Sequence, residues 1–337
     1  MEKNGSTTKF MILLIILSMG VLAASILSVM FGTAGIVPEE ILNSLFRYDP
    51  LNSSHAVIRD LRIPRTLGDI AVGAAFAVSG AIMQGMTRNP LADAGILGIN
   101  SGAVFALSLC LALLPGAGQS AAIICSFGGA ALAAFIVYGL TGLRHGKQSP
   151  VRLALAGTAV ATLFSALGQA VALHYHVGQE VTFWTAGSVA GIRFGHLVWA
   201  LPFIGIALAG AVLMSRSLSV LSVGEETARG LGIRVERTKL MGMILVLLLA
   251  GAAVSLSGPV TFVGLMVPHI VRMVTGPDYR KIIPGSMVLG SFAMLLADLL
   301  SRVVNPPYET PVGLIFAVTG VPFFLYLTRT ERRGRNV

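Results

Sequence analysis

The segment GAAFAVSG at Gly73–Gly80 recurs as GAAVSLSG at Gly251–Gly258, which is 178 residues further along the chain. Pro90 and Pro268 keep the same offset. Each copy closes a long apolar run and is followed by a turn and a second apolar run. Internal repeats in apolar chains are typical of transporters, in which two related halves enclose the substrate route. The recurrence predicts a membrane protein of two related halves, with chance similarity between Gly/Ala-rich helices as the alternative.

The composition supports a membrane protein. The 337 residues are 55% hydrophobic and only 12% charged, and the mean hydropathy is +0.81. Soluble domains carry about 25% charged residues, so this apolar surplus exceeds what one soluble core holds. Cys110 and Cys125 both lie in apolar runs and indicate neither a disulfide framework nor metal-ligand spacing. The net charge of +9 is better explained by basic cytoplasmic loops than by nucleic-acid binding.

Ten apolar stretches have the length of about 20 residues that a bilayer-spanning helix needs. They lie near residues 10–31, 66–86, 96–114, 120–141, 151–173, 197–214, 239–257, 259–275, 282–304 and 311–328. The third and eighth are short and rich in Gly or Pro, which favours positions inside the bundle. The first exceeds the 7–15 residues or so of a signal-peptide core, so we expect a retained helix.

The distribution of basic residues predicts the orientation. With both termini in the cytoplasm, 18 of the 24 Lys and Arg residues fall on the cytoplasmic side, as the positive-inside rule requires. Five spans separate the two copies of the repeat, an odd number, so the copies cross the membrane in opposite senses. The predicted fold is therefore all-α, with spans two to five as an inverted copy of spans seven to ten. One permease domain covers residues 1–337, with a first helix at 10–31, half-repeats at 66–173 and 239–328, and a connecting region at 174–238 that contains span six.

Three of the six outward-facing basic residues flank the spans closely. Arg62 and Arg65 start the second span, and Arg302 ends the ninth. One interpretation is local pairing at i,i+4 spacing, of Arg65 with Asp69 and of Arg302 with Asp298. The other is a docking surface for an acidic partner, because arginine makes directional contacts with carboxylates.

The segment LSVLSVGEETARGLGIR at Leu218–Arg234 follows the sixth span and is too polar to cross the membrane. Glu225, Glu226 and Arg229 recur at helical spacing between glycines. The pattern favours one or two short amphipathic helices at the cytoplasmic face, which could act as a lever for a partner. A solvated loop is the alternative.

Several motifs in order along nearly the whole chain resemble one family. They are RIPRTL (62–67), VSGAIMQGMTRNPLADAGILGINSGA (78–103), GEETARGLG (224–232), FVGLMVPHIVR (262–272), LLADLLSR (295–302) and TPVGLIFAVTGVPFFLYL (310–327). The chain resembles the permease subunits of bacterial ABC importers for iron–siderophores, haem and vitamin B12, of the FecCD type.

The resemblance implies a ten-helix subunit in the bacterial cytoplasmic membrane. It implies a second permease, identical or a sister chain, two cytoplasmic ATPases, and an extracellular or periplasmic binding protein that docks on Arg62, Arg65 and Arg302. The ATPases would contact the segment from Leu218 to Gly232. Within it the family match assigns coupling to Leu218, Gly224, Glu225, Glu226, Ala228, Arg229, Gly230, Leu231 and Gly232.

The family's inner gate corresponds to two places in this chain. The first is the turn at Asn89, Pro90 and Leu91, for which an ordinary turn capped by the asparagine side chain is the alternative. The second is Ser149-Pro150 at the start of span five, which departs from the Ser/Thr-rich pattern of the vitamin B12 permease. Candidates for the translocation path are Gln84, Thr162 and Ser165, with helix packing as their alternative role.

The residues that would carry out chemistry are absent from the sequence. No G-x-x-x-x-G-K-[ST] phosphate loop occurs, so we expect a transport subunit without a cofactor, with ATP and Mg²⁺ bound by a separate ATPase chain. His174, His176 and His196 are scattered, and an iron chelate already fills the metal's coordination sphere, so no metal site is predicted.

The predicted cargo is an iron(III)–siderophore complex moved by alternating access, with vitamin B12 or haem as alternatives. An ion-coupled secondary transporter is the rival from another class. Such a transporter usually needs ionisable groups within the membrane, and Asp69 and Asp298 are the few candidates here.

Overall fold

The computed structural model describes residues 2–31, 38–49, 51–116, 118–142, 150–306 and 308–334, which contain helices and no strand. Within these described residues, seven helices are long and apolar enough to cross a membrane. These are α1 (Glu2–Met30), α4 (Ile63–Thr87), α6 (Gln119–Gly142), α7 (Pro150–His174), α9 (Phe194–Val223), α11 (Val235–Ser257) and α13 (Tyr279–Val303). Three shorter apolar helices are α5 (Ile99–Leu113), α12 (Val263–Thr275) and α14 (Val312–Gly334). Together they match the ten predicted spans.

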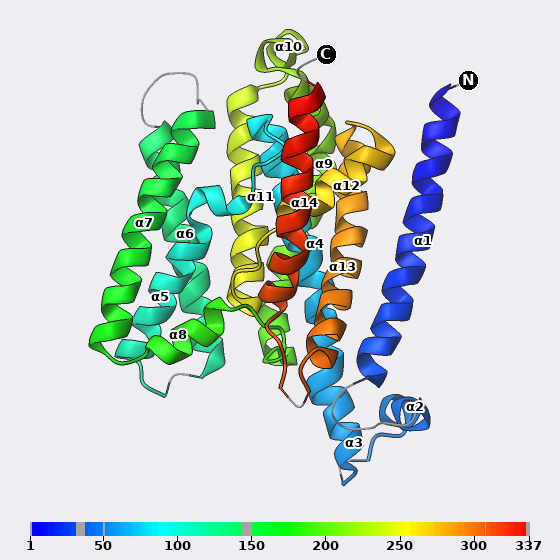
Figure 1. The fold of residues 1–337 in the computed structure, drawn as a ribbon, viewed down its shortest axis with the longest axis vertical. Helices are drawn as coiled ribbons and strands as arrows, with labels where there is room; N and C mark the ends of the chain where they lie inside the picture. The colour runs from blue at the N-terminus through cyan, green and yellow to red at the C-terminus, as the bar shows by residue number, and fades with distance from the viewer. Residues whose placement is uncertain are drawn as a thin grey trace.

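Short elements lie at the two ends of the bundle (Figure 1). At one end, α10 (Glu225–Gly230) joins α9 to α11; the start of α1 and the end of α14 lie at this same end of the bundle. We name this the α10 end. The opposite end, the α2 end, carries α2 (Pro38–Phe46), α3 (Ser53–Ala56), the π-helical turn η1 (Val57–Arg62) and α8 (Gly178–Thr185). The 3₁₀ turn η2 (Ala94–Leu97) precedes α5, so the short third span is interrupted by a turn.

Helix α4 is the central element of the fold. It contacts α9, α11, α12 and α13, and nearly all of its residues are buried. Small residues make this possible, because glycine lets two helix backbones approach closely inside a membrane. A Cβ atom added at Gly73 would collide with the carbonyl oxygen of Gly290 in α13, and one added at Gly80 with that of Gly264 in α12. The repeated segment therefore forms the tightest part of the core.

The packing is consistent with an inverted repeat. Helix α4 begins at the α2 end and α11 begins at the α10 end, so the two copies run in opposite directions. Gly73 of α4 lies against α13, and its counterpart Gly251 of α11 lies against Phe127 of α6. Because α6 and α13 occupy equivalent places in the two halves, each copy contacts the corresponding helix of the other half.

Two helices extend beyond the predicted spans. The sixth span was expected at 197–214, but α9 continues to Val223. The second span was expected from residue 66, but α4 begins at Ile63, with Pro64 in its first turn. Proline is tolerated there because the first N–H groups of a helix have no partner within the helix.

Candidate functional site

The predicted docking arginines form a buried charge cluster at the α2 end. Arg65 donates from Nε and Nη2 to Asp298 Oδ1 at 3.0 and 2.7 Å. It also donates from Nη1 and Nη2 to the two carboxylate oxygens of Glu309, at 2.8 and 2.9 Å. The side chain of Asp298 is fully buried and that of Arg65 is 11% exposed. One guanidinium thus holds α4, α13 and the segment before α14 together.

The other two arginines hold the end of α1. Arg62 donates to the carbonyl oxygens of Val29 and Met30 at 2.7 and 2.8 Å. Arg302 donates to the carbonyls of Ser28 and Phe31 at 2.8 and 2.9 Å, and it also pairs with Asp298. The last carbonyls of a helix lack partners within the helix, so these two side chains satisfy them and attach α1 to the bundle.

This geometry corrects part of the local-pairing interpretation of these arginines. The predicted Arg302–Asp298 pair is confirmed, but the predicted Arg65–Asp69 pair is wrong. Arg65 turns to α13 instead, and neither carboxylate oxygen of the buried Asp69 has a hydrogen-bond partner. The binding-protein role of Arg62, Arg65 and Arg302 stays a prediction. In this conformation it would have to act through their exposed neighbours, since the guanidinium groups are used within the chain.

At the α10 end, the predicted coupling segment divides into buried and exposed residues. Leu218 is fully buried within α9, and Ala228 is fully buried beneath α10. Leu218 and Ala228 are therefore not surface residues in this structure, and any role they have in coupling, which stays a prediction, would act through packing; the apolar part of the segment extends α9 rather than forming a separate helix. Glu226, Arg229, Gly230, Leu231 and Gly232 are exposed, and Gly224 precedes α10.

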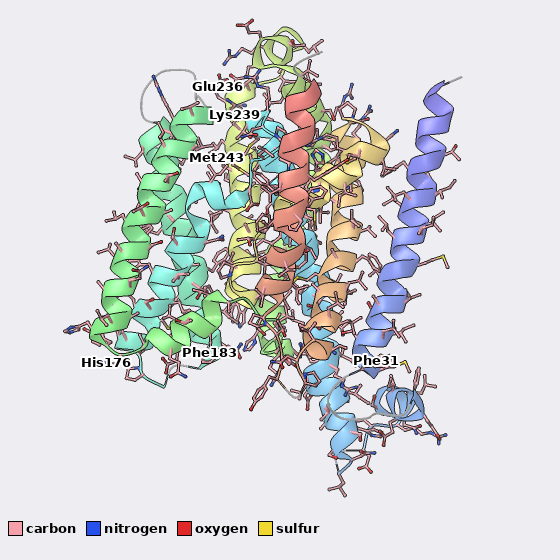
Figure 2. All side chains as sticks on the ribbon, in the orientation of Figure 1. Phe31, His176, Phe183, Glu236, Lys239 and Met243 are labelled. Atoms are coloured by element: carbon pink, nitrogen blue, oxygen red, sulfur yellow. The ribbon has the colours of Figure 1, made fainter. Side chains whose placement is uncertain are left out.

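Helix α10 is held against α11 by charges. Glu225 accepts from Lys239 Nζ at 2.7 Å, and both side chains are largely buried. Arg229 donates to Glu236 at 2.7 Å on the exposed side. Lys239 and Glu236 lie beside α10 in Figure 2. Glu225 is therefore a residue that positions α10, whereas Glu226 and Leu231 are among the exposed residues that a partner can reach. The predicted short helix is confirmed.

The proposed gate turn at Asn89–Leu91 directly follows α4. Arg88 ends the helix in a left-handed conformation with φ of 52°. Asn89 Oδ1 accepts from the backbone N–H of Leu91 at 3.0 Å, as in an ordinary capped turn. This local bond shows how the turn is stabilised and leaves its gating role a prediction. Ser149 lies outside the described residues, and Pro150 is the first residue of α7.

The path residues fall in two different environments. Gln84 is 2% exposed and bonded to neighbouring helices, so it has a packing role in this conformation, and its place on the translocation path stays a prediction. Thr162 is exposed on α7, and Ser165 lines an open cavity of about 500 Å³ between α5, α7 and α8. Other polar residues of this cavity are Ser101, Gln169, Thr182 and Thr185. Thr182 and Thr185 were missed because α8 is too short and polar to stand out among the spans.

A match to a protein-family model shows the family to which this chain belongs. The FecCD transport family matches residues 20–330. The chain belongs to the FecCD transport family. FecCD relatives include the iron(3+)-hydroxamate import system permease protein FhuB of Bacillus subtilis (strain 168), which is 46% identical over 91% of this chain and 80% of the relative. The ferric enterobactin transport system permease protein FepD of Escherichia coli (strain K12) is 38% identical over 92% of this chain and 93% of its own length.

A solved structure supports the same fold. It is an inward-facing conformation of a transporter assigned to the metal-chelate ABC type, with 26% identity and a TM-score of 0.82 over 94% of this chain and 98% of that one. The chain is thus a multi-span membrane protein of the FecCD family and a permease subunit of an ABC importer. The cobalamin import system permease protein BtuC of Halobacterium salinarum is also related, at 37% identity over 82% of this chain and 74% of its own length.

Proposed function

We propose that this FecCD chain carries an iron(III)–siderophore complex of the hydroxamate class across the cytoplasmic membrane. The observation that carries the proposal is the 46% identity to a hydroxamate permease over nearly the whole chain. The cobalamin relative is matched at lower identity and coverage, so vitamin B12 is the second candidate, and haem the third. Ion-coupled secondary transport has no support among these relatives.

The cavity between α5, α7 and α8 suits this cargo. Its hydroxyl and amide groups are neutral, and no group of three or more His, Cys, Asp or Glu side chains that could hold a metal occurs in the described residues. A chelate with a filled coordination sphere needs weak polar contacts rather than ligands, because a transport site must release what it binds. Ser165 and Gln169 of α7 are the residues we assign to this passage.

The proposed complex contains two permease subunits, two ATPases and a binding protein. The α10 end faces the cytoplasm, as the distribution of Lys and Arg favours, and the binding protein approaches the α2 end. ATP and Mg²⁺ belong to the ATPase chains, and this chain needs no cofactor. ATP binding moves α10, and the permease pair alternates between outward and inward states. Nucleotide shifts this equilibrium only through its different affinity for the two states.

Leu231 provides the test of the ATPase contact. Its apolar side chain is 67% exposed at the end of α10, where it can fill a groove of a partner. Leu231→Ser should weaken ATPase association about tenfold or more, as for a central interface residue, without changing the thermal stability of the permease. The measurement is ATPase retention and hydrolysis in the purified complex.

Two matched variants complete this test. Leu51→Ser alters a side chain that is 94% exposed at the α2 end and should leave ATPase retention unchanged. Glu225→Ala removes the largely buried carboxylate that contacts Lys239 and should lower both stability and coupling. Full ATPase retention by Leu231→Ser would rule out α10 as the contact.

A further inference from the structure

A hydrogen-bonded joint connects the end of α9, next to α10, with the start of α13. Ser219 Oγ donates to Asp278 Oδ1 at 2.9 Å and accepts from the backbone N–H of Tyr279 at 2.8 Å. Burial raises the pKa of Asp278, but hydrogen bonds from Arg280 and Ser219 outweigh it and hold this pKa below its usual value. Asp278 therefore remains ionised at neutral pH, and the joint persists there.

The joint leads directly to the central helix. Tyr279 is 3% exposed, and a Cβ atom added at Gly85 of α4 would lie 3.0 Å from its ring and 3.3 Å from Leu218 of α9. Three helices thus meet at Gly85, where the absence of a side chain lets the ring lie against the α4 backbone. A shift of α9 at this point would therefore press on Tyr279 or on α4.

A second set of hydrogen bonds continues from Tyr279 to the end of α4. Arg272 of α12 donates from Nη2 to the Tyr279 hydroxyl at 3.1 Å and to Gln84 Oε1 at 2.8 Å. Gln84 in turn donates from Nε2 to the carbonyls of Gly264 and Leu265, at 3.2 and 3.3 Å. All of these acceptors are neutral, and the salt bridges found among the described residues do not include Arg272. A hydrogen bond that involves a charged group such as the Arg272 guanidinium contributes about 1.5–3 kcal/mol, and one between neutral groups, such as those that Gln84 donates, contributes about 1 kcal/mol.

Gln84 connects this hydrogen-bond network to the proposed gate turn. It lies one turn before the end of α4, and the Asn89–Leu91 turn follows directly. We propose that Ser219, Asp278, Tyr279, Arg272 and Gln84 form a continuous hydrogen-bonded relay that transmits displacement of α10 to this turn. The relay rests on the proposed contact of α10 with the ATPase and names the positioning residues through which that contact would open the inner gate.

The experiment separates transmission from simple stabilisation. The complete importer, with its ATPases and binding protein, is reconstituted in proteoliposomes. The measured quantity is the ratio of ferric hydroxamate taken up to ATP hydrolysed. Ser219→Ala and Gln84→Leu each remove more than one hydrogen bond and should each lower this ratio by about fivefold or more, since the loss of about 1 kcal/mol already corresponds to about fivefold, while assembly and hydrolysis persist.

Matched controls remove hydroxyl groups that bond only within their own helix. Ser222 donates to the carbonyl of Ser219 at 2.8 Å, and Thr87 donates to that of Met83 at 2.7 Å. Ser222→Ala and Thr87→Val, each one turn or less from a relay residue, should keep the wild-type ratio of uptake to hydrolysis.

A reporter at the turn gives a readout that a purely structural role would not change. Asn89→Cys is introduced with Cys110 and Cys125 replaced by alanine, and its labelling rate is compared with and without a non-hydrolysable ATP analogue. The nucleotide should change this rate in the otherwise unaltered reporter protein and not in the Ser219→Ala or Gln84→Leu background.

An unchanged ratio of uptake to hydrolysis in either relay variant would overturn the proposal. So would a parallel loss of uptake and hydrolysis, or a failure of both variants to assemble, because the contacts would then only maintain the fold. The result for Leu231→Ser is independent: if that variant keeps its ATPases, the role of α10 fails, whereas failure of the relay variants alone leaves that role intact.

Discussion

Arg65→Ala is expected to leave little folded protein. The substitution removes both carboxylate contacts of Arg65 and leaves Asp298 fully buried with one arginine partner fewer. Breaking a buried ion pair on one side costs about 3–5 kcal/mol, a large share of the roughly 5–15 kcal/mol that stabilises a typical folded protein. The measurement is the monodisperse yield and thermal unfolding midpoint in mild detergent.

Two further variants separate charge from geometry. Arg47→Ala removes an exposed arginine at the same end of the bundle and should leave the unfolding midpoint within error of the wild type. Arg65→Lys keeps the charge but cannot span two carboxylates with a planar fork, so its midpoint should lie between the other two. If Arg65→Ala unfolds at the same temperature as Arg47→Ala, the cluster does not hold the fold.

Gly80→Ala is expected to have the second large effect. The added methyl group would overlap the carbonyl oxygen of Gly264, which belongs to a backbone that cannot rotate away. Overpacking a close-packed interior typically costs about 1–3 kcal/mol, and separating α4 from α12 also disturbs the helices on either side. The unfolding midpoint and transport should both fall.

The control for this substitution is another helical glycine. A Cβ atom added at Gly128 of α6 meets nothing within 4 Å, and alanine is favoured over glycine in a helix by about 0.8–1 kcal/mol. Gly128→Ala should therefore be neutral or stabilising. Equal stability of Gly80→Ala and Gly128→Ala would contradict the close approach of α4 and α12.

The repeat can also be tested through its two equivalent glycines. Gly73→Ala would push against the backbone of Gly290, whereas a methyl group at Gly251 would lie 3.2 Å from the ring of Phe127, which can shift. Gly73→Ala should therefore destabilise the protein more than Gly251→Ala. Sequence similarity between the two copies marks equivalent positions but does not determine what lies opposite each of them.

The sequence predicted the membrane helices well because their main determinant is local. Apolar length alone identifies a spanning helix, and the helices near 120–141 and 239–257 begin and end within a few residues of α6 and α11. The offset between Gly73–Gly80 and Gly251–Gly258 indicated the central helices for a similar reason. A short run of small residues in a sequence indicates a place where two helix backbones pack closely together.

The site was less predictable because its contacts connect distant parts of the chain. Arg65 has a carboxylate four residues away, yet it bonds with residues 233 and 244 positions further on. Leu218 was placed in a polar lever because polar residues follow it, although its own apolar turn extends α9. Arg272 stood within a family motif, but only the fold shows that it contacts both Tyr279 and Gln84.

Uptake by whole cells tests the central claim most directly. Cells lacking this chain, and the same cells with it restored, are given radiolabelled ferric hydroxamate siderophore or radiolabelled cobalamin. We predict that loss of the chain abolishes ferric hydroxamate uptake alone, and that wild type restores it whereas Leu231→Ser does not. Loss of cobalamin uptake alone, or unchanged uptake of both compounds, would contradict the assignment to iron(III)–siderophore import.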